Sequence, residues 1–182
     1  MHRYVVQRFC FLMVFLFFFC SGFSSAGEDS FDGESVDSVI KALYASISFE
    51  KGEFPDLERL RALFAPGACF VRLKEQGLDR MDASSFITSF SERIKTGEIE
   101  SFYEAEVGRR EHVYDRMVQI FSSYVKGANT RDREKYIRGI NGIQLFFDGK
   151  GWRIASIVWE DETPGRPIPE HFLHKTGKPS RD

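Results

Sequence analysis

The 182-residue sequence lacks most of the features that would indicate a particular chemistry. Its charges are nearly balanced, with 25 Lys and Arg residues against 27 Asp and Glu residues, so it offers no basic footprint for nucleic acid. No glycine-rich stretch opens a helix as a phosphate-binding loop does. No serine has a histidine and a carboxylate at a recognisable spacing. We therefore expect no nucleic-acid partner, and the sequence indicates an architecture rather than an activity.

Metal ligands are scarce as well. His112 falls at a predicted turn, and His171 and His174 lie three residues apart in a Pro-rich segment without a further cluster of ligands. A protein metal site needs several ligands held on a rigid scaffold. The sequence therefore predicts no metal site and no cofactor.

The first 26 residues are typical of a secretory signal peptide. Arg3 and Arg8 give a basic start, Phe9–Cys20 is an unbroken apolar run, and Ser24 to Ala26 are small residues where a signal peptidase cleaves. The run is shorter than the roughly 20 residues of a membrane-spanning helix. We expect cleavage after Ala26, export to the periplasm or out of the cell, and no stable membrane span afterwards. Lipidation of Cys20 is the alternative, although Phe19 stands where a small residue is needed.

Cleavage would leave one cysteine and a mildly acidic chain. The loss of Arg3 and Arg8 leaves 23 basic residues against 27 acidic ones. Cys69 then has no intrachain disulfide partner, and its apolar neighbours Ala68 and Phe70 are typical of a buried thiol. The core of this exported domain must therefore hold without covalent links.

Hydrophobic spacing predicts three helices in the first half of the chain. They follow a polar leader over residues 27–34, and Ser35 and Asp82 are placed to cap the first and third of them. Pro66 and Gly67 should end the second. The predicted helices span residues 36–51, 56–65 and 83–96, and a strand spans residues 69–74.

The second half of the chain predicts four strands in succession, over residues 102–111, 116–125, 137–147 and 152–159. The last two are joined by the hairpin turn Asp148–Gly151. Strict alternation would place Ile143 and Leu145 on one face and Ile140 on the other. In the last strand the same alternation would place Trp152, Ile154 and Val158 on one face and Ala155, Ile157 and Trp159 on the other.

A sheet that is apolar on both faces needs two covers. The helices can cover one face, and a second copy of the chain is the simplest cover for the other, so the sequence predicts a homodimer packed through the sheets. The order of elements is a segregated α+β plan in one domain over residues 35–162. A Pro-rich tail follows over residues 163–182.

Several segments resemble the nuclear transport factor 2-like (NTF2-like) superfamily, and its uncharacterised bacterial SnoaL-like set in particular. They are L-F-A-P-G-A-C-F after the second helix, E-x-E-x-x-R at Glu104 to Arg109, I-F-S-S-Y at residues 120–124, and R-G-I-N-G-I-Q-L with G-W-R-I and W-E-D-E in the last hairpin. The resemblance covers residues 35–173. It implies a cone-shaped α+β barrel, in which a curved, mostly antiparallel sheet wraps around three N-terminal helices, with a pocket at the open end and frequent dimerisation.

The resemblance leaves the function open, because the superfamily includes isomerases, dehydratases and cyclases as well as binding and scaffolding proteins. The leading hypothesis is an exported small-molecule-binding domain for a small organic ligand. The alternatives are a cofactor-free isomerase, dehydratase or cyclase, and a structural or protein-interaction domain at the cell envelope. The predicted strand carries Arg72 and Lys74 where ketosteroid isomerase would suggest an acid.

Polar residues on the predicted strands supply the candidate site. Glu106 and Tyr124 are the candidates for acid and base work. Glu104 shares a strand face with Glu106, and ion pairs with nearby arginines are the alternative role for both. The remaining polar groups could instead lie in a dimer interface. The candidate ligand-binding residues are Tyr44, Glu106, Arg109, Ser122, Tyr124, Asn141, Gln144 and Trp159.

Overall fold

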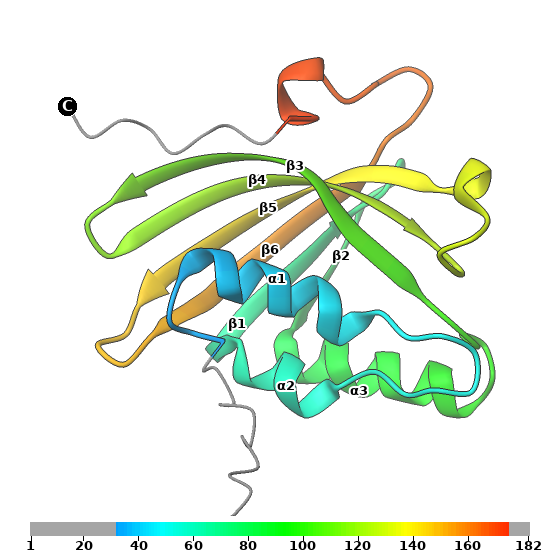
Figure 1. Ribbon diagram of the computed structural model, residues 1–182, viewed down its shortest axis with the longest axis horizontal. Helices are drawn as coiled ribbons and strands as arrows, with labels where there is room; N and C mark the ends of the chain where they lie inside the picture. The colour runs from blue at the N-terminus through cyan, green and yellow to red at the C-terminus, as the bar shows by residue number, and fades with distance from the viewer. Residues whose placement is uncertain (1–31, 175–182) are drawn as a thin grey trace, which may run out of the picture.

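The computed structural model describes residues 32–174 and contains helices on one side of a single sheet (Figure 1). The predicted signal peptide, Cys20, most of the leader and residues 175–182 of the tail lie outside the described residues. The elements are α1 (Val36–Ile47), α2 (Leu57–Ala62), β1 (Phe64–Leu73), β2 (Leu78–Asp82), α3 (Ala83–Lys95), β3 (Tyr103–Tyr114), β4 (Met117–Gly127), β5 (Ile137–Phe147) and β6 (Trp152–Asp161), with the short 3-10 helices η1 (Arg133–Lys135) and η2 (Glu170–Phe172).

The six strands form one curved sheet in the order β2-β1-β6-β5-β4-β3. Every neighbouring pair is antiparallel except β1 and β6, which run parallel. The predicted α+β class and mostly antiparallel sheet are therefore confirmed. The sheet is open rather than closed into a barrel, and β2 and β3 are its edges.

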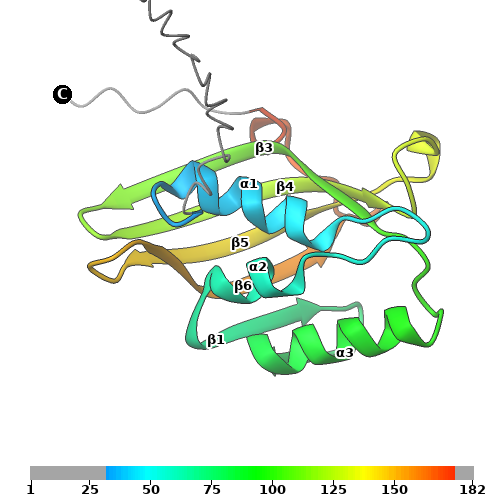
Figure 2. The same ribbon diagram turned by 60° about the horizontal axis from the view of Figure 1, so that its bottom comes forward.

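Local sequence sets where the helices begin. Ser35 accepts a hydrogen bond from the Ser38 amide at 3.0 Å while the Ser38 hydroxyl accepts one from the Ser35 amide, which satisfies two amides of the first turn of α1. Asp82 caps α3 in the same way through the Ser85 amide at 2.7 Å. Both caps were predicted. All three helices lie against the same face of the sheet (Figure 2), which we call the inner face.

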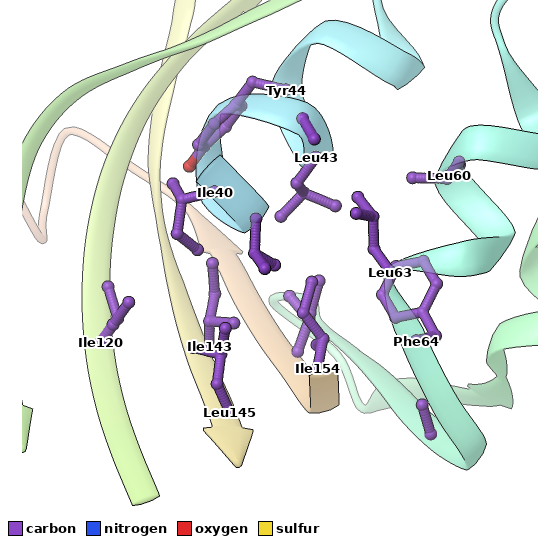
Figure 3. Close-up of a cluster of buried hydrophobic side chains, with 14 of the residues drawn as sticks. Ile40, Leu43, Tyr44, Leu60, Leu63, Phe64, Ile120, Ile143, Leu145 and Ile154 are labelled. Carbon is purple, nitrogen blue, oxygen red and sulfur yellow. The ribbon is translucent and has the colours of Figure 1, made fainter. Parts of the chain in front are cut away.

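The core lies between α1 and the inner face of the central strands (Figure 3). Ile40 and Leu43 of α1 face Ile120, Ile143 and Ile154, which come from three adjacent strands; none is more than 5% exposed. Burial of apolar side chains on this scale supplies most of the driving force for folding. No disulfide contributes within the described residues, where Cys69 is a free thiol.

Several elements differ from those predicted. Helix α1 ends at Ile47 because Ser48 is extended and Phe49 forms a bridge with Phe102. Pro66 lies inside β1, where the pairing with β6 is irregular between Phe64 and Cys69 and no ladder bond from its nitrogen is needed. The exposed edge strand β2 has no apolar alternation and was not predicted.

Two β-bulges change which side chains face the core. In β6 the pairing with β5 shifts between Gln144 and Leu145, so Ile154 and Ile157 are both buried although they are three residues apart. The predicted opposition of these two residues is therefore wrong. In β3 a similar shift between Glu106 and Gly108 turns Arg109 towards Glu106.

The tail packs on the outer face of the sheet, opposite the helices (Figure 1). The Phe172 ring lies 5.5 Å from the Phe121 ring, and Ser123 donates to the Phe172 carbonyl at 2.6 Å. A Cβ on Gly108 would lie 2.3 Å from that same carbonyl, so only glycine permits this close approach. Apolar side chains elsewhere on this face, including Val158 at 38% exposed, stay partly accessible.

Candidate functional site

A cavity of about 180 Å³ lies between the helices and the inner face of the sheet. Its walls are mainly aliphatic and aromatic, and all of its polar groups except Arg93 of α3 come from strands. The apolar lining consists of Leu43, Ile47, Leu60, Phe64, Phe70, Phe86, Phe90, Ile99, Phe102, Ile157 and Trp159, and the polar lining of Arg72, Arg93, Glu104, Tyr124, Lys126 and Asn141. An apolar space with a few convergent polar groups is the usual form of a ligand site.

Glu104 of β3 is the acid of this cavity. It accepts a hydrogen bond from the Asn141 amide nitrogen at 3.2 Å. Burial raises the pKa of Glu104 to about 7, although the hydrogen bond from Asn141 and the positive charge of Lys126 act in the opposite direction. Near neutral pH this carboxyl group can therefore both give and accept a proton.

Tyr124 of β4 lies across β5 and contacts β6. The sheet register aligns Tyr124 with Gly139 and Gly139 with Asp161, and the Tyr124 hydroxyl donates to the Asp161 carboxylate at 2.5 Å. A Cβ on Gly139 would lie 2.2 Å from the tyrosine ring, so the glycine creates the space that the ring fills. Burial and the bond to Asp161 raise the pKa of Tyr124, which keeps it neutral.

Two cations share the Asp161 carboxylate. Lys126 bonds to one oxygen, and Arg72 lies 3.4 Å from the other. Burial disfavours ionisation of Asp161, but the bonds from Lys126 and Tyr124 outweigh burial and lower its pKa. This cluster therefore combines two positive charges with one negative charge at the polar side of the cavity.

A chain of hydrogen bonds runs from the cavity into the protein. Asn141 donates to the Tyr44 hydroxyl at 3.1 Å, and the Tyr44 and Ser122 hydroxyls lie 2.7 Å apart. Ser122 donates to Glu106 at 2.8 Å, so Tyr44 must be the donor to Ser122. Figure 3 shows Tyr44 projecting from α1 towards the strands. The chain fixes the Asn141 amide, and hence the donor that holds Glu104.

Glu106 is held in an ion pair behind the cavity. Arg109 donates to both of its carboxylate oxygens, at 2.8 and 2.9 Å, and also to Asp37 at 2.6 Å. The side chains of Arg109 and Glu106 are 10% and 8% exposed. Burial disfavours the charged guanidinium, but the bonds to Glu106 and Asp37 outweigh it and raise the pKa of Arg109. A two-pronged buried pair of this kind positions the bulge and is a structural feature.

No protein-family model matches the sequence, and no curated protein matches it either. Solved structures do match. A cystatin-like protein from Caulobacter vibrioides is 12% identical, with 71% of this chain and 89% of that chain covered and a TM-score of 0.55. A cystatin-like protein of unknown function from Nostoc punctiforme is also 12% identical, with 71% and 90% covered and a TM-score of 0.52.

The chain has a cystatin-like fold. An NTF2-like protein of unknown function from Silicibacter pomeroyi is similar at 14% identity, with 69% of this chain and 92% of that chain covered and a TM-score of 0.49. These similarities concern the fold alone. Within residues 32–174, no helix has the length and apolar character needed to cross a membrane, and no three His, Cys, Asp or Glu side chains are grouped for a metal.

The cystatin-like fold brings most of the predicted site residues together. Tyr124, Asn141 and Trp159 line the cavity, whereas Tyr44 and Ser122 lie behind it in the hydrogen-bond chain. Glu106 and Arg109 form the ion pair at the end of that chain. Gln144 is exposed and lines a separate surface depression with His112 and Tyr114.

Four charged residues at the cavity were not among the predicted site residues. They are Arg72, Arg93, Glu104 and Lys126. The period of two correctly put Glu104 and Glu106 on one face, but it could not indicate which of them faces the cavity. Gly108 inside a strand was a usable signal, because an isolated glycine there often marks a bulge.

Proposed function

We propose that this protein is an exported small-molecule-binding domain whose cavity holds one compact, largely apolar ligand by its ring and one polar group. The observation that supports this proposal is the cavity itself, with aromatic walls and with Glu104, Asn141 and Tyr124 gathered on one side. Its volume of about 180 Å³ slightly exceeds the roughly 150 Å³ in which an engineered apolar cavity binds benzene. The ligand therefore has about one ring.

Export and dimerisation belong to the same proposal. Residues 1–26 have the composition of a signal peptide, so the domain would act in the periplasm or outside the cell. The partly exposed apolar side chains of the outer face, such as Phe121 and Val158, would pack against a second copy. Such a dimer would leave the cavity accessible, because the cavity lies on the inner face of the sheet and the dimer would use the outer face.

The binding proposal is tested by filling the cavity. Ile157 lines the cavity and its neighbour Val158 faces outwards, so Ile157→Trp and Val158→Trp are a matched pair. The probe is benzamide, and its binding to the mature protein is measured by ligand-observed saturation-transfer NMR. We expect a signal for the wild type and for Val158→Trp, and its loss in Ile157→Trp. Absence of signal from the wild type, or equal signal from all three proteins, would overturn the proposal.

A second candidate function is cofactor-free proton transfer, and Glu104 is the observation that favours it. Its pKa of about 7 and its fixed Asn141 partner suit a general base for an isomerase, dehydratase or cyclase. Exchange of the α-hydrogens of phenylacetone for deuterium, followed by NMR in D₂O, would measure such transfer. The exchange should be faster with the wild type than with Glu104→Gln; equal rates would exclude Glu104 as the base.

A further inference from the structure

We propose that the ligand of this cavity is a small aromatic or alicyclic carboxylate, with its ring among the apolar side chains and its carboxylate between Arg72 and Lys126. The inference rests on the proposed function, because it assigns a ligand class to the same cavity. It follows from the charges at the cavity, from their depth, and from the state of the one acid among them.

The charged side chains that line the cavity are mostly cationic. Arg72, Arg93 and Lys126 oppose the single acid Glu104. Arg93 pairs with Glu98 at 2.7 Å, but both side chains are at least half exposed, and such pairs are weak. Arg72 and Lys126 share one carboxylate, that of Asp161. The positive charge is therefore in excess on this side of the cavity, and an anionic ligand would balance it.

The burial of Lys126 and the geometry of Arg72 allow this excess positive charge to attract an anionic ligand. The Lys126 side chain is only 16% exposed, and charges that are shielded from water attract a neighbouring anion more strongly. Arg72 is 45% exposed and makes a single 3.4 Å contact with Asp161, so its planar guanidinium can still take a carboxylate in a two-pronged arrangement. The apolar walls then hold the ring at the other end.

Glu104 adds a dependence on protons. The titratable and charged groups around it are Lys126, Asp161, Tyr44 and Tyr124, with Arg72 and Arg93 on the cavity lining. A bound carboxylate favours the protonated form of Glu104 and can accept a hydrogen bond from it. A ligand cation would instead meet Arg72 and Lys126, whose two positive charges exceed the single negative charge of Asp161.

Three probes of the same shape separate the possibilities. Benzoate is an anion, benzamide is neutral and benzamidine is a cation, and their affinities can be measured by isothermal titration calorimetry on the mature protein at pH 6. We expect benzoate to bind at least about tenfold more tightly than benzamide, with no detectable binding of benzamidine. Raising the pH to 8 should weaken benzoate about tenfold, because the protonated fraction of Glu104 falls from about 0.9 to about 0.1.

Variants locate the carboxylate. Arg72→Gln should reduce benzoate affinity about tenfold and leave benzamide unchanged; Lys126→Gln should act in the same direction. Arg116→Gln is the matched control, because Arg116 is 71% exposed and does not line the cavity. Circular dichroism shows whether each variant is folded.

The outcomes distinguish the two proposals. If none of the three probes binds the wild type, the proposed function fails and the ligand class fails with it. If benzamide binds as tightly as benzoate, or if benzamidine binds most tightly, the cavity is a ligand site and the carboxylate inference is wrong. An Arg72→Gln variant that is folded and binds benzoate normally would also overturn the inference.

Discussion

Glu104 and Glu106 lie two residues apart on one face of β3, yet their surroundings give them opposite roles. Glu106 accepts two hydrogen bonds from the buried Arg109 and one from Ser122. Glu104 has one amide donor, no ion pair within 4 Å among residues 32–174, and a raised pKa of about 7. The comparison teaches that a shared strand face determines only direction, whereas the partners determine the chemistry.

Removing the charge of Glu106 should have the largest effect. Glu106→Gln would weaken the bonds to Arg109 and leave that buried guanidinium with less compensation, although Asp37 and Glu111 stay within 4 Å of it. We expect a loss of about 3 kcal/mol in the free energy of unfolding, measured by urea denaturation at pH 7. Glu98→Gln, in an exposed pair, is the control and should cost less than about 1 kcal/mol. Equal losses would contradict the distinction between the two carboxylates.

Displacing Tyr124, which lines the same cavity as Glu104, should have the next largest effect on the free energy of unfolding. In Gly139→Ala the added methyl group would overlap the tyrosine ring and break its bond to Asp161. We expect a loss of about 2 kcal/mol, within the usual range for overpacking. Gly149→Ala is a matched control for steric overlap, because no atom lies within 4 Å of a Cβ there, although its positive φ adds strain of its own. An unchanged Tyr124–Asp161 contact in a crystal structure of Gly139→Ala would refute the steric argument.

Neutralising Glu104 should have the smallest effect near pH 5, and that effect should grow as the pH rises. Because its folded-state pKa of about 7 lies above the ordinary value of 4.5, the stability linked to its protonation is fully present below about pH 4.5 and is lost as the pH rises through 7. Glu104→Gln removes this loss. The variant should exceed the wild type by less than about 1 kcal/mol at pH 5 and by about 3 kcal/mol at pH 8.

Denaturation curves of both proteins at the two pH values measure this difference. If Glu104→Gln instead destabilises the protein equally at pH 5 and pH 8, Glu104 acts in the fold as an ordinary ionised carboxylate. The comparison with Glu106 would then lose its basis.

The sequence predicted the fold well where the signal was local. Caps at Ser35 and Asp82 and the Asp148–Gly151 turn were readable because each depends on a few neighbouring residues. The register of β6 was not, because a bulge in its pairing with β5 interrupts the period of two. The edge strand β2 escaped prediction because its side chains are exposed or half-buried and carry no apolar pattern.

The candidate site was predictable only where neighbouring residues in one strand carried the signal. Tyr124, Asn141 and Trp159 are polar or aromatic residues within apolar strands, and such positions indicate a pocket or an interface. The cavity cations Arg72 and Lys126 come from β1 and β4, which are not neighbours in the sheet. They meet at Asp161 of β6, and no spacing within one strand encodes that.

The Tyr124 side chain of β4 crosses over Gly139 of β5 and bonds to Asp161 of β6. It therefore links two strands that are not neighbours in the sheet. Separating either β4 or β6 from β5 would break the bond between Tyr124 and Asp161 as well as the ladder, so this bond couples the local opening of the three strands.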